Sequence, residues 1–66
     1  MNLNELIRMR KWAKKNNYQI VWDSATKRWG AAKNGDKSRP ITPYFEKMEN
    51  LQEHLIQQMY HDMASK

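Results

Sequence analysis

The sequence contains no cysteine among its 66 residues. Disulfide bonds and zinc sites built on cysteine are therefore excluded, and stability has to come from side-chain packing, from self-association or from a partner. The absence of cysteine is also typical of a reducing compartment, so we expect a cytoplasmic protein. Glycine is rare too: Gly30 and Gly35 are the only two, and their spacing matches neither a phosphate-binding loop nor a dinucleotide-binding motif.

Long apolar runs are missing as well. No stretch approaches the roughly 20 apolar residues that a membrane-spanning helix needs, and residues 1–5 lack the charged-then-apolar order of a secretory signal. We therefore expect a soluble mature protein with no membrane association. A chain this short forms one domain at most, so residues 1–66 are taken as a single domain.

Residues suited to catalysis are few. The two histidines, His54 and His61, are seven positions apart on a predicted helix, which separates them by roughly 10 Å. Imidazole nitrogens bind a metal ion at about 2 Å, so the pair cannot share one ion. Glu46, Glu49 and Glu53 have the spacing of a solvated helix face. We therefore predict a protein that is not an enzyme and that has no metal and no cofactor.

Charge is unevenly distributed along the chain. There are 12 Lys and Arg against 7 Asp and Glu, which gives a net charge of +5. Residues 1–43 hold ten of the basic and three of the acidic residues, a net of +7, whereas residues 44–66 carry a net of −2. A basic first part favours an anionic partner, but ordinary solubility explains a net charge of this size equally well.

The first predicted element is a helix over residues 3–15. Asn2 stands where a capping residue is expected, and Glu5 follows three positions later as in a capping box. At 100° per residue one arc of this helix is apolar, with Leu3, Leu6, Ile7, Met9 and Ala13. A second arc is basic, with Arg8, Lys11 and Lys15 together and Lys14 beside them. Asn16 and Asn17 tolerate the left-handed conformation that ends many helices.

Two strands are expected next, over residues 18–23 and 28–33. The first alternates with the period of two that indicates a strand. Asn34-Gly35 is a strong signal for a second hairpin, because both residues accept a positive φ. Residues 38–41 fit a short third strand, which Pro40 would restrict to an edge of the sheet.

The last predicted element is a helix that begins at Thr42 and Pro43, with Thr42 as its cap. Its apolar positions recur every three or four residues, in a stripe of Phe45, Met48, Leu51, Leu55, Ile56, Met59, Tyr60 and Met63. This stripe is long for a three-stranded sheet to cover. We therefore expect its end, residues 56–63, to be exposed in a monomer and to be covered by a partner or by a second copy.

Together these elements predict an α+β fold: a small two-layer domain of helix, β-hairpin with a short third edge strand, and helix, whose antiparallel sheet is covered on one face by the helices. The order of elements resembles that of double-stranded-RNA-binding domains. Those domains carry lysines at the start of their last helix, where this sequence has Phe45-Glu46-Lys47-Met48-Glu49. The segment 21–35 is also similar to the short sheets of integrase arm-binding domains, in which a strand pair enters a DNA groove.

Basic and aromatic residues are interleaved in the hairpin and follow the basic arc of the first helix, a combination that nucleic-acid-binding proteins use for phosphates and bases. We predict a non-enzymatic domain that binds DNA or RNA with low sequence specificity. Its contacts come mainly from cations, because a domain of this size needs Trp22 and Trp29 in its core. The predicted nucleic-acid-binding residues are Arg8, Lys11, Lys14, Lys15, Lys27, Arg28, Lys33 and Lys37.

A protein-binding function is the alternative. Very small domains often act as regulators or inhibitors of a larger machine, as accessory proteins of phages do, and would then bind through exposed apolar anchors. The anchors expected here are Trp12, Ile56, Met59, Tyr60 and Met63, although for Trp12 a place at the edge of the core is favoured over an exposed anchor. A homodimer through the last helix is compatible with either function.

Overall fold

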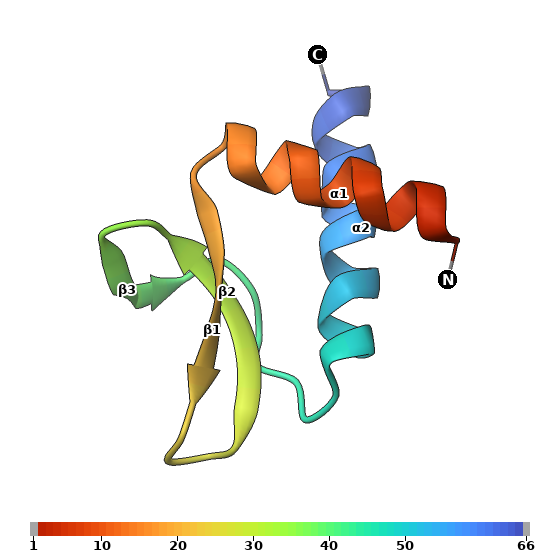
Figure 1. Cartoon of the computed structure of the whole chain (residues 1–66). Coiled ribbons are helices and arrows are strands. Elements are labelled where there is room, and N and C mark those ends of the chain that lie inside the picture. Colours follow the sequence, from red (N-terminus) through yellow and green to blue (C-terminus); the bar gives the residue numbers. More distant parts are fainter. Residues whose placement is uncertain (1, 66) are drawn as a thin grey trace.

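The computed structural model describes residues 2–65, with the side chain of Lys37 excepted. The elements follow in the order α1 (Leu3–Lys15), β1 (Tyr18–Asp23), β2 (Arg28–Lys33), β3 (Asp36–Pro40) and α2 (Met48–Ala64). The strands form an antiparallel sheet in the order β1-β2-β3, and both helices lie to one side of it (Figure 1). The predicted α+β architecture of helix, hairpin, third strand and helix is confirmed.

Both predicted ends of α1 are confirmed. The Asn2 side-chain Oδ1 accepts a hydrogen bond from the backbone N–H of Asn4 at 2.8 Å, which satisfies one of the donors that the first helical turn leaves unpaired. At the other end, Asn17 adopts a left-handed φ of 60°, the conformation that stops a helix. The chain then enters β1 directly.

The buried arc of α1 differs from the predicted one. Met9 is buried, and Leu6 and Trp12 pack partly against the same core, whereas Leu3 and Ile7 are exposed. The reason is the path of α1, which crosses α2 rather than lying along the sheet (Figure 1). The side of the helix that carries Leu6, Met9 and Trp12 faces the core, so Leu3 and Ile7, which lie off that side, remain in solvent.

The helices cover the sheet unevenly. Ile20 pairs with Ala31, and Trp22 with Trp29, so these four side chains share one face. Ala31 belongs to the core with Leu51 and Leu55 of α2, while Ile20 and Trp22 are 43% and 46% exposed. The expectation that both Trp22 and Trp29 lie in the core is therefore wrong for Trp22. Trp29 packs against the core, whereas Trp22 lies at its open side, with ring centroids 4.6 Å apart.

The opposite face of β2 is covered by an aromatic ring. A Cβ placed on Gly30 would lie only 2.9 Å from a ring carbon of Tyr44, so the close approach of this ring requires glycine. Ala32, two residues further on, is completely buried. The small residues of β2 therefore allow close packing on both sides, by α2 over Ala31 and by Tyr44 over Gly30.

The predicted start of the last helix at Thr42 and Pro43 is wrong, because α2 begins only at Met48. Residues 41–45 instead bind the edge of β2. The Ile41 N–H donates to the Ala31 carbonyl at 2.8 Å, and the buried Thr42 Oγ1 accepts from the Ala31 N–H at 3.1 Å. Phe45 and Trp29 exchange both backbone hydrogen bonds. These bonds to β2 replace the helical bonds that the same backbone groups would otherwise make.

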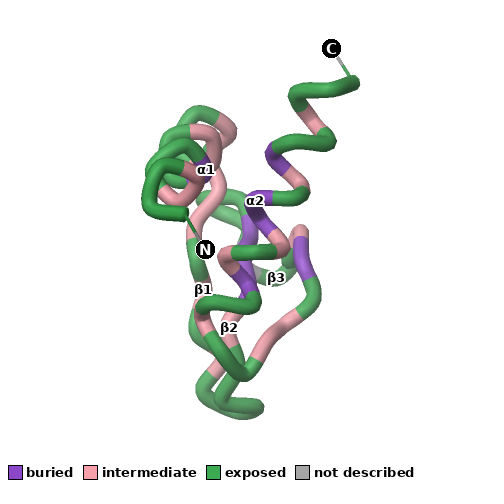
Figure 2. Tube along the Cα trace, turned by 90° about the vertical axis from the view of Figure 1, so that its right-hand side faces the viewer, coloured by how far each residue is buried: buried purple, intermediate pink, exposed green. Residues whose placement is uncertain are grey.

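The apolar stripe of α2 supplies most of the core. Leu51, Leu55, Ile56 and Met59 are buried, and the buried positions follow one side of the helix above β2 (Figure 2). The expected exposure of residues 56–63 in a monomer is therefore wrong for Ile56 and Met59, because α1 crosses over this part of α2 and covers it. Tyr60 and Met63 do reach the surface.

Replacing Thr42 with valine is expected to lower the free energy of unfolding by about 1–3 kcal/mol, because the buried Ala31 N–H then loses its acceptor while the side-chain shape is kept. Urea denaturation followed by circular dichroism measures the change. Thr42→Ser is the matched control, since it keeps the hydroxyl and removes one methyl group, which costs about 1 kcal/mol. A Val variant as stable as the wild type would show that this hydrogen bond does not hold residues 41–45 against β2.

Candidate nucleic-acid interface

Helix α1 is the most basic element of the structure. Five of its last eight residues are cationic and exposed: Arg8, Arg10, Lys11, Lys14 and Lys15. Among the side chains that the structure describes, the two ion pairs are Arg28–Glu46 and Arg39–Asp36, so neither involves α1. Cations that form no ion pair remain available to an external anion.

Arg10 is a member of this array that the sequence analysis missed. It lies off the arc of Arg8, Lys11 and Lys15, and the helical spacing alone gave no reason to include it. In the structure Arg10 and Lys14 flank one side of α1, and Arg8, Lys11 and Lys15 flank the other. Each side borders its own groove.

The first of these, which we call the α2-end groove, lies between α1 and the end of α2. It has a volume of about 520 Å³ and is lined by Arg8, Lys11, Trp12, Lys15, Asn16, Met59, Asp62 and Met63. Three of the predicted phosphate-binding cations thus meet three of the predicted apolar anchors. The sequence analysis assigned these two sets to competing functions, and the crossing of α1 over α2 places them around one groove.

Trp12 is held firmly within this groove. Its indole Nε1–H donates to Asp62 Oδ2 at 3.1 Å, and its ring meets Tyr18 edge-on with centroids 5.3 Å apart. Asn16 Nδ2 donates to the Trp12 carbonyl at 2.8 Å. The ring is partly buried against the core, so Trp12 is both a core-edge residue and one wall of the groove.

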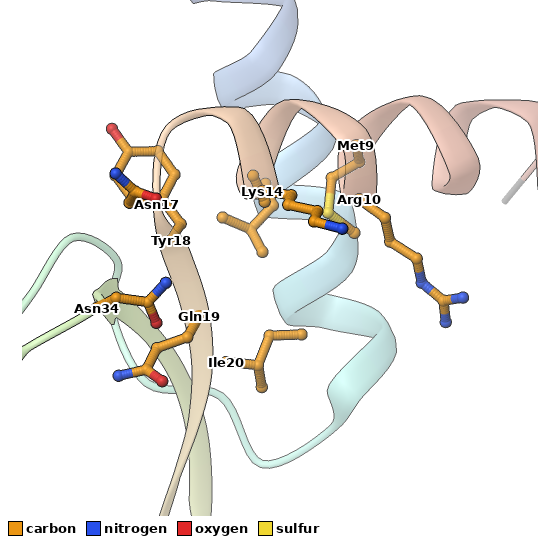
Figure 3. A pocket seen from close by; sticks show the side chains of 10 residues that line it. Met9, Arg10, Lys14, Asn17, Tyr18, Gln19, Ile20 and Asn34 are labelled. Carbon is orange, nitrogen blue, oxygen red and sulfur yellow. The ribbon is translucent and has the colours of Figure 1, made fainter.

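The second groove runs beside β1, on the other side of α1, and has a volume of about 490 Å³. Figure 3 shows Met9 and Ile20 on the side toward α2, with Gln19 and Asn34 on the other side of β1. The sheet register agrees, because Gln19 pairs with Ala32 and Ile20 with Ala31, on opposite faces. The amide side chains and the apolar side chains therefore do not converge on one ligand position.

The predicted hairpin cations lie apart from α1. Lys27 is at the turn with a left-handed φ of 56°, and Arg28 is 3.6 Å from the Glu46 carboxylate. The six residues of β1 separate this turn from α1 by about 17 Å. Lys33, opposite Tyr18, is at the α1 end of the hairpin. The Lys37 side chain lies outside the described residues.

Two of the predicted protein-binding anchors on α2 are available at the surface, and they face different neighbours. Tyr60 donates a long hydrogen bond of 3.4 Å to Glu5 Oε2 of α1. Met63 is 58% exposed and lines the α2-end groove. The exposed apolar surface at this end of α2 is therefore confined to the neighbourhood of α1.

The histidines of α2 do not form a metal site with their neighbours in the described part of the chain. Within residues 2–65 there is no group of three His, Asp or Glu side chains placed to hold a metal ion. The His54 ring instead lies 5.6 Å from that of Phe45. Neither helix in this range is long and apolar enough to cross a membrane.

Comparison with models of protein families finds no match, and comparisons with curated proteins and with solved structures find none either.

Proposed function

We propose that this protein binds nucleic acid, with low sequence specificity, through the exposed cationic surface of α1. The observation that carries the proposal is the set of five α1 cations without an ion-pair partner among the described side chains. Phosphates are the natural ligands for such an array, since each contact releases counterions from the nucleic acid.

The distribution of acidic residues supports the same surface. Glu5 is the one acidic residue of α1, and it lies near Tyr60. Glu46 lies beside Arg28, close to the hairpin turn. The charge that gives the chain its excess of Lys and Arg is therefore concentrated on α1, and the hairpin turn contributes little net charge.

Low sequence specificity follows from the types of side chain that α1 presents. Phosphate contacts position a protein on nucleic acid, whereas base recognition requires donors and acceptors aimed at base edges. Lysines predominate over arginines in the second half of α1, and lysine acts as a point charge rather than as the bidentate fork that recognises guanine. The expected affinity is accordingly electrostatic.

The wild-type protein is expected to bind labelled DNA and RNA oligonucleotides with a dissociation constant that rises steeply with salt. Three to five phosphate contacts predict a slope of log K against log salt between about −2 and −4.5. Fluorescence anisotropy at about 50 and 200 mM salt measures it. Absence of binding at the lower salt, for every nucleic acid tested, would contradict the proposal, because weak cationic binding is strongest there.

One observation favours the alternative, a protein-binding regulator: the apolar side chain of Met63 is exposed at the α2-end groove, beside Trp12. A partner for this surface would need acidic residues around an apolar anchor to match the three bordering cations. Such binding does not require that the protein bind nucleic acid, so the absence of binding in the anisotropy measurement would leave this alternative in place.

A further inference from the structure

We infer that the α2-end groove holds an unpaired base of a single-stranded nucleic acid while Arg8, Lys11 and Lys15 hold its phosphates. This inference rests on the proposed function and makes it narrower, because it names single-stranded DNA or RNA as the preferred ligand. It also gives Trp12 and Met63 a role in binding.

The lining of the groove combines the two chemistries that a single strand presents. Trp12 and Met63 form an apolar surface next to the buried Met59, which suits the face of a base. The volume of about 520 Å³ lies in the range of small-ligand sites, about 300–1,000 Å³. Proteins that bind single strands pair such apolar or aromatic surfaces with a cationic track for the backbone.

The cations lie along one border of the groove. Arg8 and Lys15 are separated by seven residues, which is about 10 Å along the helix axis, and Lys11 stands between them. A row of this length can contact more than one phosphate of the same strand. The phosphates would then lie on the α1 side and leave the base to turn toward α2.

Asp62 makes the groove itself favour a base over a phosphate. Its Oδ2 accepts from Trp12 Nε1, which fixes the carboxylate in place, and no hydrogen bond to Oδ1 occurs within the described residues. A carboxylate repels phosphate and accepts hydrogen bonds from base amino groups. The carboxylate therefore favours a base inside the groove, and the three cations favour the phosphates at its border.

Trp22 is the exposed tryptophan of the hairpin, and charge argues against it as the base-binding site. Near it, Lys27 and Arg28 are offset by Asp23 and by Glu46, which pairs with Arg28. The α2-end groove retains an excess of two positive charges over its one carboxylate. A base at Trp22 would therefore receive little help from phosphate contacts.

The central test compares a labelled single-stranded DNA with a duplex of the same sequence, at matched low salt. The wild type is expected to bind the single strand about tenfold more tightly, since a duplex keeps its bases stacked and offers only phosphates to the groove. Met63→Ser is expected to weaken single-strand binding about fivefold by removing part of the apolar surface. It is expected to leave the affinity for the duplex unchanged, and also the salt dependence of binding to the single strand and to the duplex. Leu3→Ser, at an exposed apolar position on the opposite side of α1, is the matched control. It is expected to change the affinity for neither the single strand nor the duplex.

A second measurement locates the base directly. A nucleoside monophosphate is expected to shift the Trp12 indole N–H resonance in an NMR titration, and inorganic phosphate at the same concentration is expected not to. The indole signals of Trp22 and Trp29 serve as internal references. A shift confined to Trp22 would place the base on the hairpin and overturn the inference.

The outcomes separate this inference from the proposed function. Equal affinity for single strand and duplex, with Met63→Ser without effect, would overturn the inference and leave nucleic-acid binding by α1 intact. No binding to either nucleic acid would overturn both. If, in that case, a labelled acidic peptide bound and Met63→Ser weakened it, the groove would be assigned to a protein partner instead.

Discussion

Leu55→Ala is expected to lower the free energy of unfolding by about 2–5 kcal/mol, the largest effect of any single substitution considered. Leu55 is about 1% exposed and lies in the core with Met9 of α1 and Ala31 of β2. The alanine would leave a cavity at the one place where α1, α2 and the sheet meet. A chain of 66 residues has a total stability of about 3–10 kcal/mol, so this single loss removes a large part of it.

Thermal and urea unfolding, followed by far-ultraviolet circular dichroism, measure this effect. Met63→Ala is the control on the same helix: its side chain is largely exposed, so a change within about 0.5 kcal/mol is expected. Leu55→Ala with wild-type stability would show that α2 does not pack on the sheet through this residue. The packing of α1 across α2 would then need another explanation.

The elements that were predicted correctly are those determined by interactions between residues close together in the sequence. The cap at Asn2, the stop at Asn17 and the turn at Gly35, where φ is 87°, involve backbone groups only a few residues apart. Alternation and helical spacing likewise identified β1, β2 and the centre of α2. These features need no knowledge of the rest of the chain, and for that reason the order of elements and the α+β architecture were predictable.

The start of α2 was not predictable in this way, because distant interactions decide it. Thr42 and Pro43 carry the sequence signature of a helix start. The Thr42 hydroxyl is used instead by the Ala31 N–H, and Phe45 pairs with Trp29. A cap signal shows only that a residue is able to begin a helix. Whether it does depends on the edge of β2, whose position the sequence does not reveal.

The candidate site was predictable in its parts and not in its arrangement. The cations of α1 and the apolar residues Trp12, Met59 and Met63 were identified separately from helical spacing. Their meeting around the α2-end groove depends on the crossing of α1 over α2, which is a tertiary feature. Arg10 was missed for a related reason: its exposure depends on which arc of α1 faces α2, and that arc is centred on Met9.

Replacing Arg8, Lys11 and Lys15 together with glutamine is expected to reduce nucleic-acid affinity about 100-fold at about 50 mM salt. The slope of log K against log salt is expected to become shallower by about 2–3, since each lost phosphate contact removes about 0.7–0.9. The three side chains are exposed, and glutamine is nearly as good a helix former as lysine or arginine. We therefore expect the circular dichroism spectrum of the variant to match that of the wild type. Fluorescence anisotropy across the salt series measures the loss of affinity and the change in slope.

The matched control removes the same number of charges away from α1: Lys27 and Arg28 at the hairpin turn and Lys47 just before α2 are replaced together with glutamine. Its net charge equals that of the α1 variant, so any difference in affinity between the two reports where the nucleic acid lies rather than how much charge the protein carries. Because Arg28 is paired with Glu46 and Lys27 is at the far end of β1, we expect a slope within about one unit of the wild type. Equal losses in both variants would contradict a site on α1, because binding would then depend on overall charge alone.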